Sequence, residues 1–157
     1  MEELLNIKDD YERALALVNI AFKNIKDRAG KPYIGHLIRV SEKFEDKDTK
    51  IAGLLHDTIE DIDYIDEKCL SNLNFNKNII DIIKIVSKHP NDKNYHDFIT
   101  RVINSNNINA IKVKYADMLD NYDLNRIKEL PKDEQEYLIN KYSKEIIRLK
   151  KIVEGRE

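Results

Sequence analysis

Glycine and proline are scarce in this sequence, and their scarcity limits the folds open to it. The 157 residues contain four glycines and three prolines, so tight hairpins have few places to turn. Between these breaks, apolar residues recur at helical spacing, as in the stripe formed by Tyr11, Leu15, Val18 and Phe22. The pattern predicts an all-α fold.

The expected helices are separated by short polar breaks, and no repeat or linker divides the chain. They are expected over residues 9–26, 33–44, 49–61, 65–73, 76–87, 94–104, 107–122 and 133–153. Gly30 and Pro32 follow the first helix, and Asp48 is the expected N-cap of the third. We expect residues 1–157 to form one domain, because a chain of this length can bury a single core.

Composition and charge argue against several classes of protein. Apolar residues make up 41% and charged residues 36% of the chain, which is typical neither of a disordered chain nor of a membrane protein. The net charge of -2 supplies no positive field for binding nucleic-acid phosphates. Cys69 is the only cysteine and no N-terminal signal pattern is visible, so a cytoplasmic location is expected.

One histidine and three carboxylates stand out on the third expected helix. With His56 at the origin and about 100° per residue, Glu60 falls near 40°, Asp57 near 100° and Asp61 near 140°. Apolar side chains fill the remaining arc. This face is consistent with a functional site, and equally with the solvated side of an ordinary amphipathic helix.

The expected helix over residues 107–122 carries apolar residues on nearly all sides, which indicates that it is buried. Asp117 and Asn121 lie one turn apart on it. An unpaired buried carboxylate is costly, so Asp117 requires a cation. That cation is either Lys114, one turn back, or a metal ion shared with His56 and Asp57.

A mixed set of imidazole nitrogens and carboxylate oxygens suits a borderline divalent metal. Open coordination positions on such an ion accept water and a phosphate oxygen. His36, on the helix after Pro32, is a candidate fourth ligand. A single histidine in that place is more often an ordinary, partly buried residue.

Three sequence strings occur together and in order: GKPYIGH at 30–36, LLHDTIED at 54–61 and VKYADMLDN at 113–121. They resemble the HD superfamily of metal-dependent phosphohydrolases. More closely, they resemble the hydrolase domain of RelA/SpoT enzymes and the small stand-alone alarmone hydrolases, which remove the 3′-pyrophosphate of (p)ppGpp using Mn²⁺. The resemblance covers about residues 21–126 and implies a single-domain, HD-type helical bundle, with the helix over about 133–153 outside the motifs.

The resemblance also implies roles for individual residues. The implied metal ligands are His36, His56, Asp57 and Asp117, with Mn²⁺ as the expected ion and another divalent metal as the alternative. Glu60 and Asp61 are the implied acidic pair that orients or deprotonates the attacking water. Many HD proteins lack this pair, so its presence favours the pyrophosphohydrolase branch.

Substrate recognition matches the family less closely. The alarmone hydrolases carry Arg-Lys-Ser-Gly where this chain has residues 27–30, Asp-Arg-Ala-Gly, so their base-stacking arginine is missing. Asn121 matches the family's ribose-contacting asparagine, whereas Met118, Asp120, Asp123 and Leu124 depart from its pattern. The segment DNYDLNR at 120–126 resembles instead a group of short bacterial HD proteins.

Chemistry or position suggests roles for further residues. The candidate substrate contacts are Arg28, Lys114, Asn121 and Arg126, with surface charge as the alternative for the three basic residues. Tyr95 is expected to line a nucleotide pocket or to join the core. His89 and His96 lie outside the motifs and are expected to be structural or exposed.

These observations favour a metal-dependent phosphohydrolase acting on a phosphorylated nucleotide. The leading hypothesis is an activity like that of a guanosine-3′,5′-bis(diphosphate) 3′-pyrophosphohydrolase. A 5′-nucleotidase or phosphodiesterase of the same superfamily is the first alternative, and a non-catalytic nucleotide-binding module is the second. Too little chain follows residue 126 for a (p)ppGpp synthetase domain, so a dual enzyme is not expected.

Overall fold

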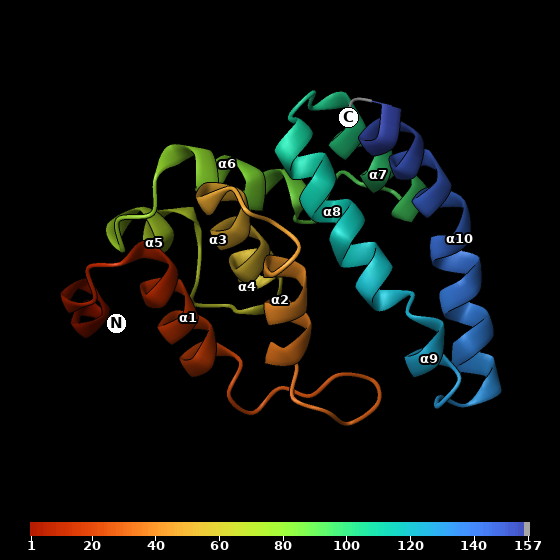
Figure 1. The fold of residues 1–157 in the computed structure, drawn as a ribbon, viewed down its shortest axis with the longest axis horizontal. Helices are drawn as coiled ribbons and strands as arrows, with labels where there is room; N and C mark the ends of the chain where they lie inside the picture. Colours follow the sequence, from red (N-terminus) through yellow and green to blue (C-terminus); the bar gives the residue numbers. More distant parts are fainter. Residues whose placement is uncertain (156–157) are drawn as a thin grey trace.

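The computed structural model describes residues 1–155, and within that range the protein is all-helical apart from an isolated β-bridge between Lys26 and Pro32. Figure 1 shows two groups of helices with α8 running between them. The first group consists of a short 3₁₀ helix (Glu2–Asn6), α1 (Asp10–Ala21), α2 (Ile34–Ser41), α3 (Lys47–Leu55), α4 (Thr58–Asp61), α5 (Glu67–Asn72) and α6 (Lys77–Val86). The second consists of α7 (Tyr95–Asn104), α9 (Leu124–Ile127) and α10 (Lys132–Gly155), and α8 is Ile108–Asn121.

Asparagine and aspartate punctuate the chain where glycine and proline are missing. At the start of most helices, the side chain of an asparagine or aspartate accepts a hydrogen bond from a backbone N–H in the first turn. The accepting residues are Asp9, Asp46, Asp66, Asn76, Asn94, Asn107 and Asp123. Asn74 and Asn106 have positive φ angles of 64° and 58° and stand just after α5 and α7. A glycine-poor chain can therefore still turn sharply between short helices.

Helix α8 joins two hydrophobic clusters. The first cluster is built mainly from α1, α2, α3 and α6, and the second from α7, α8 and α10. Ala110 and Val113 of α8 belong to the first cluster, and Ile111 and Met118 belong to the second. The prediction that this helix is buried on most sides is confirmed, while the extent of the domain, 1–157, stays a prediction.

The prediction of the third helix, over residues 49–61, is wrong in two respects. Its N-cap is Asp46, whose carboxylate accepts from Thr49 N, and not Asp48. The helix is also interrupted at His56 and Asp57, between α3 and α4. At the break, the side chain of Thr58 donates through Oγ1 to the carbonyl of Leu55 at 2.7 Å. This carbonyl therefore accepts from a side chain, whereas in a continuous helix it would accept from a backbone N–H.

Other boundaries differ at the helix ends. The first helix ends at Ala21 rather than at residue 26, and residues 22–33 form a loop closed by the Tyr33 N to Ile25 O bond of 2.9 Å. The sequence reasoning missed the short 3₁₀ helix and α9. The expected helices over 76–87, 94–104 and 107–122 agree with α6, α7 and α8 to within a residue at each end.

Helix α10 packs against α7 and α8, as its position across the second group in Figure 1 shows. The buried Glu145 anchors it, accepting from Arg148 at 2.5 Å and contacting His96 of α7 at 3.1 Å. His96 is exposed, and His89 Nε2 lies 3.2 Å from the Lys84 carbonyl, so both have the structural or exposed places expected of them. Among the described helices, none has the length and apolarity to cross a membrane.

Candidate metal centre

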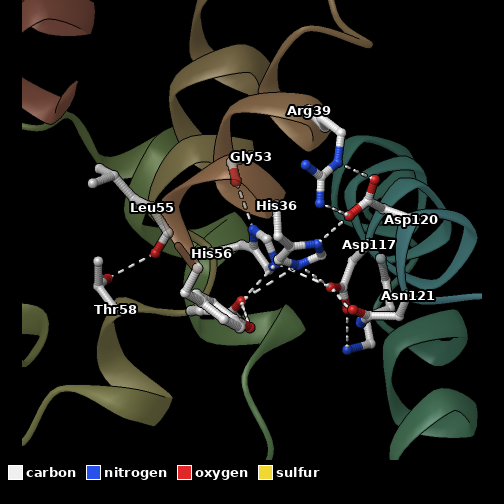
Figure 2. Close-up of polar contacts among 12 residues, drawn as sticks. His36, Arg39, Gly53, Leu55, His56, Thr58, Asp117, Asp120 and Asn121 are labelled. Carbon is white, nitrogen blue, oxygen red and sulfur yellow. Dashed lines mark hydrogen bonds and ion pairs between the residues drawn. The ribbon is translucent and has the colours of Figure 1, made fainter. Parts of the chain in front are cut away.

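Two histidines and two aspartates from distant parts of the chain converge between α2, the α3–α4 break and α8 (Figure 2). They are His36 on α2, His56 and Asp57 at the break, and Asp117 on α8. One potential ligand atom from each lies within 4.8 Å of the others, and all four residues are buried. The structure thus brings together the four residues expected to hold a metal ion.

The ligand atoms of the cluster face one another closely. Asp117 Oδ1 lies 2.9 Å from His36 Nε2 and 3.1 Å from His56 Nε2. Asp57 Oδ2 lies 3.1 Å from His56 Nε2 and 3.6 Å from His36 Nε2. The helix break permits this arrangement, because adjacent side chains of an unbroken helix diverge by about 100°.

The tautomer of His56 follows from its other ring nitrogen. His56 Nδ1 lies 2.5 Å from the carbonyl oxygen of Gly53, which can only accept, so Nδ1 carries the proton. In the neutral ring, Nε2 then directs a lone pair toward the two carboxylates. Acceptors that face acceptors need a cation between them, and imidazole with carboxylate is a donor set that fits a borderline divalent metal.

The electrostatics of the metal-free cluster agree with this need for positive charge. Burial lowers the pKa of His56, but Asp57 and Asp117 outweigh burial and hold the pKa well above its usual value. Burial raises the pKa of Asp117, but Lys114 and the histidines hold it well below its usual value. Asp117 therefore stays ionised while His56 tends to hold a proton, so the carboxylates draw positive charge to the place where a cation fits.

Asp117 pairs with Lys114, one of the two cations proposed for it from the sequence, and its other oxygen faces the histidines. Its Oδ2 accepts from Lys114 Nζ at 2.8 Å, while its Oδ1 faces the histidines. Asn121 Nδ2 also donates to Asp117 Oδ1 at 3.1 Å. Lys114 lies 4.6 Å from the ring centroid of Phe98, so this ammonium group is buried against an aromatic face.

Tyr33 is a member of the site that the sequence reasoning missed. Its hydroxyl donates to Asp57 Oδ2 at 2.6 Å. Burial and the Asp57 carboxylate raise the pKa of Tyr33, so the phenol stays protonated and keeps donating. Its place in the GKPYIGH string, three residues before His36, was the available signal.

A cavity with a volume of about 540 Å³ opens beside the cluster, within the size range of small-molecule sites. Its acidic lining residues are Asp57, Glu60, Asp61 and Asp117. Its basic lining residues are Arg28, Lys88, Lys114 and Lys141. The cavity therefore holds acidic groups at the cluster and several basic groups around it.

Glu60 and Asp61 reach this cavity from α4, beyond the helix break. Glu60 Oε1 accepts from Lys88 N at 3.3 Å. Reduced hydration, with Asp57 and Glu60 nearby, raises the pKa of Asp61 to about 7. The helical-wheel angles do not apply across the break, yet both carboxylates line the cavity beside the cluster, together with Asp57 and Asp117.

A smaller cavity of about 260 Å³ adjoins the first and shares Arg28, Tyr33, Asn121 and Tyr142 with it. Apolar side chains line its other end, namely Ile127, Leu130 and Leu138. Arg126 lines it too, while its Nη2 lies 3.1 Å from Asp120 Oδ2. All four expected substrate contacts therefore line one or both cavities.

Helix α10 adds three residues that the sequence reasoning did not single out: Tyr137, Lys141 and Tyr142. Lys141 Nζ lies 4.8 Å from the ring centroid of Tyr95 and 5.2 Å from that of Tyr142. Burial lowers its pKa, and no carboxylate in residues 1–155 lies within ion-pair distance of it. Tyr95 lines the cavity and also packs against the second hydrophobic cluster. It thus combines the two positions expected for it, at a pocket and in the core.

Comparisons with known proteins agree with this geometry. The family model of the HD domain matches residues 25–154. The chain is 30% identical over 167 residues to a probable guanosine-3′,5′-bis(diphosphate) 3′-pyrophosphohydrolase of Mycoplasma genitalium, with 90% of this chain but only 22% of that relative covered. The chain therefore spans about a fifth of that relative's length.

A solved structure shares the fold. It is described as a metazoan ortholog of SpoT that hydrolyses ppGpp, and the two structures superpose with a TM-score of 0.73. The match covers 90% of this chain and 85% of the other at 17% sequence identity. At this identity the likeness concerns the arrangement of helices.

Proposed function

The chain belongs to the HD domain family, and from this premise we propose that it is a metal-dependent phosphohydrolase of phosphorylated nucleotides. The proposed reaction removes the 3′-pyrophosphate from a substrate of the guanosine 3′,5′-bis(diphosphate) type. The observation that carries the proposal is the buried group of acceptor atoms from His36, His56, Asp57 and Asp117 beside a polar cavity. The Mycoplasma relative, named for that reaction, supports the choice of substrate.

His36, His56, Asp57 and Asp117 are the proposed ligands of a divalent ion, with Mn²⁺ as the proposed metal. When bound, such an ion polarises a phosphoryl oxygen and lowers the pKa of a coordinated water. Tyr33 contributes by donating to Asp57 Oδ2, which orients that carboxylate toward the cluster. Lys114 and Asn121 hold Asp117 in the same way.

Glu60 is the proposed general base, with Asp61 beside it. The backbone N–H of Lys88 donates to one Glu60 oxygen at 3.3 Å, which leaves the other free to take a proton from the attacking water. Both carboxylates line the cavity beside the cluster, so neither needs a large movement to reach a substrate bound there.

The remaining basic groups are the proposed phosphate contacts. Lys114 is already neutralised by Asp117, whereas Lys141 stands against tyrosine rings with no described carboxylate beside it. Arg28 lies 3.7 Å from Glu134 in a mostly exposed pair, which is weak. Lys141, Arg28 and Lys88 can therefore bind the phosphates of a polyanionic substrate.

The smaller cavity is the proposed place of the nucleoside. Its apolar end can cover a base or ribose, while Asn121 supplies an amide for hydrogen bonding. Arg126 Nε makes no hydrogen bond among the described residues, although Asp123 Oδ2 lies 3.9 Å away, and it is the proposed second donor there. Because the base-stacking arginine of the alarmone hydrolases is missing at residues 27–30, the base preference is to be measured.

The direct test is a nucleotide panel assayed with Mn²⁺, in which pyrophosphate and orthophosphate are measured separately. Mn²⁺-dependent release of pyrophosphate from (p)ppGpp is the expected result. Orthophosphate with a nucleoside would indicate a nucleotidase, and an opened cyclic nucleotide would indicate a phosphodiesterase. Nucleotide binding without turnover, with or without Mn²⁺, would indicate a non-catalytic module and contradict the proposal.

Replacing Lys141 with methionine is expected to raise KM by about tenfold or more with little change in kcat. The variant keeps the aliphatic stem against the tyrosines but loses a charge-assisted contact to phosphate, which contributes about 1.5–3 kcal/mol. Steady-state kinetics on the hydrolysed nucleotide check it. Lys144→Met, one turn along the exposed side of α10, is the control and should leave KM unchanged; an equal effect of the two substitutions would refute the assignment.

A further inference from the structure

Asp120, on the last turn of α8, is surrounded by three cationic or donor groups from other elements, and Figure 2 shows two of them, His36 and Arg39. Its Oδ2 lies 2.6 Å from His36 Nδ1. Its Oδ1 accepts from Arg39 Nε at 2.8 Å, and its Oδ2 accepts from Arg39 Nη2 at 3.1 Å. Arg126 Nη2, on α9, lies 3.1 Å from the same Oδ2. The carboxylate therefore links α2, α8 and α9 directly behind the metal centre.

This arrangement determines the state of the His36 ring. A carboxylate that faces two guanidinium groups stays ionised and can only accept hydrogen bonds. The proton of the His36 ring therefore lies on Nδ1, and Nε2 directs its lone pair toward Asp57 and Asp117. Without Asp120, the ring could rotate or carry its proton on the ligand nitrogen.

The two histidines of the centre differ in how they are held. His56 is fixed by a backbone carbonyl, that of Gly53, which no side-chain substitution removes. His36 is fixed by a side chain, and that side chain is held by Arg39 and Arg126. The orientation of His36 therefore depends on a side chain outside the ligand set, that of Asp120.

We infer that Asp120 is a positioning residue that fixes the orientation and tautomer of His36 as a metal ligand, and that Arg39 and Arg126 hold Asp120 in place. Groups that orient a ligating histidine typically change metal affinity by 10–100-fold when removed. The inference rests on the proposed function, because it takes the cluster to be a metal site. It also gives Arg126 a structural task through Nη2, in addition to its place in the smaller cavity.

The first test measures Mn²⁺ affinity by isothermal titration calorimetry for the wild type and for Asp120→Asn. Asparagine is nearly the same size but offers a neutral oxygen that the arginines hold poorly, so we expect 10–100-fold weaker binding. The control is Asp63→Asn, an exposed aspartate between α4 and α5, which should bind Mn²⁺ like the wild type. Wild-type affinity in Asp120→Asn overturns this inference alone, whereas a wild type that binds no Mn²⁺ overturns the proposed function as well.

The second test observes the ring directly. The chain has four histidines, so the ring nitrogens can be resolved by ¹⁵N NMR of the protein loaded with Zn²⁺, a d¹⁰ ion. In the wild type, His36 should show a protonated Nδ1 and a ligated Nε2. In Asp120→Asn the His36 signals should shift while those of His56 stay in place; unchanged His36 signals contradict the inference.

Arg39→Met provides a variant that retains Asp120, in case Asp120→Asn folds poorly. Arg39 is 43% exposed, so its removal leaves little buried surface unsatisfied. His36 and Arg126 still hold Asp120 in this variant, so we expect weaker Mn²⁺ binding by a smaller factor than in Asp120→Asn. Affinity equal to that of the wild type would show that Arg39 does not hold Asp120 and would overturn that part of the inference.

Discussion

Asp117→Asn is expected to abolish divalent-metal binding and hydrolysis, and to lower the free energy of unfolding by about 3–5 kcal/mol. The first effect follows because the Asp117 carboxylate faces both histidines of the cluster. The second follows because Lys114, which is buried, loses its carboxylate partner. Calorimetry with Mn²⁺ measures the metal binding, and urea denaturation measures the stability.

A double variant separates these two roles of Asp117. In Asp117→Asn with Lys114→Met, the unpaired ammonium is gone and an apolar side chain fills its place against Phe98. Stability should therefore recover by several kcal/mol, while metal binding and activity should stay absent. Full metal binding in either variant would contradict the ligand assignment, and equal stability of the single and double variants would contradict the role of Lys114.

Glu60→Gln is expected to lower kcat by about 10²–10⁴-fold while the protein binds its metal with unchanged affinity. Glutamine keeps the shape of the side chain and can still accept from Lys88 N, but it cannot take a proton from water. Turnover assays and Mn²⁺ calorimetry on the same preparation measure the two properties together.

The neighbouring carboxylates provide the comparison for Glu60. Asp61→Asn tests which member of the pair acts as the base, and the more damaging substitution identifies it. Glu67→Gln removes a carboxylate on α5 that pairs with Lys84, outside the cavity, and should leave kcat unchanged. Loss of metal in Glu60→Gln would place Glu60 among the ligands and contradict its assignment as the base.

The sequence predicted the buried cluster of two histidines and two aspartates because its main signals are local. The apolar periodicity around Asp117 indicates a buried helix, and a buried carboxylate requires a partner. His56 and Asp57 stand beside each other in the chain, although it is the helix break that lets both of them face the cluster. Joining His36 to this group, by contrast, depended on the family resemblance as well as on residue chemistry.

The features that were missed depend on tertiary contacts or on side-chain bonds to the backbone. The break after Leu55 is invisible in the hydrophobic pattern, because apolar residues continue at helical spacing through Ile59 and Ile62. Asp46 and Asp48 are both good N-caps by residue type, and the structure selects the first. These are choices between locally similar alternatives.

Asp120 and Lys141 illustrate the tertiary part of the problem. In the sequence, Asp120 is a departure from a family pattern and Lys141 is one of many basic residues on a long amphipathic helix. Their significance appears only when α2 brings His36 to Asp120 and α10 carries Lys141 over the cavity. The hydrophobic periodicity of α8 or α10 alone cannot predict these contacts, because they are made with other elements.

The proposed ligands of the metal ion are far apart along the chain, since 81 residues separate His36 from Asp117 and 61 separate His56 from Asp117. An unfolded chain cannot hold one ion with all of them, so the ion binds mainly the native state. At a free concentration of one hundred times Kd, such binding shifts the folding equilibrium by about 2.7 kcal/mol. The midpoint of thermal denaturation should therefore rank candidate cations by affinity before any substrate is known.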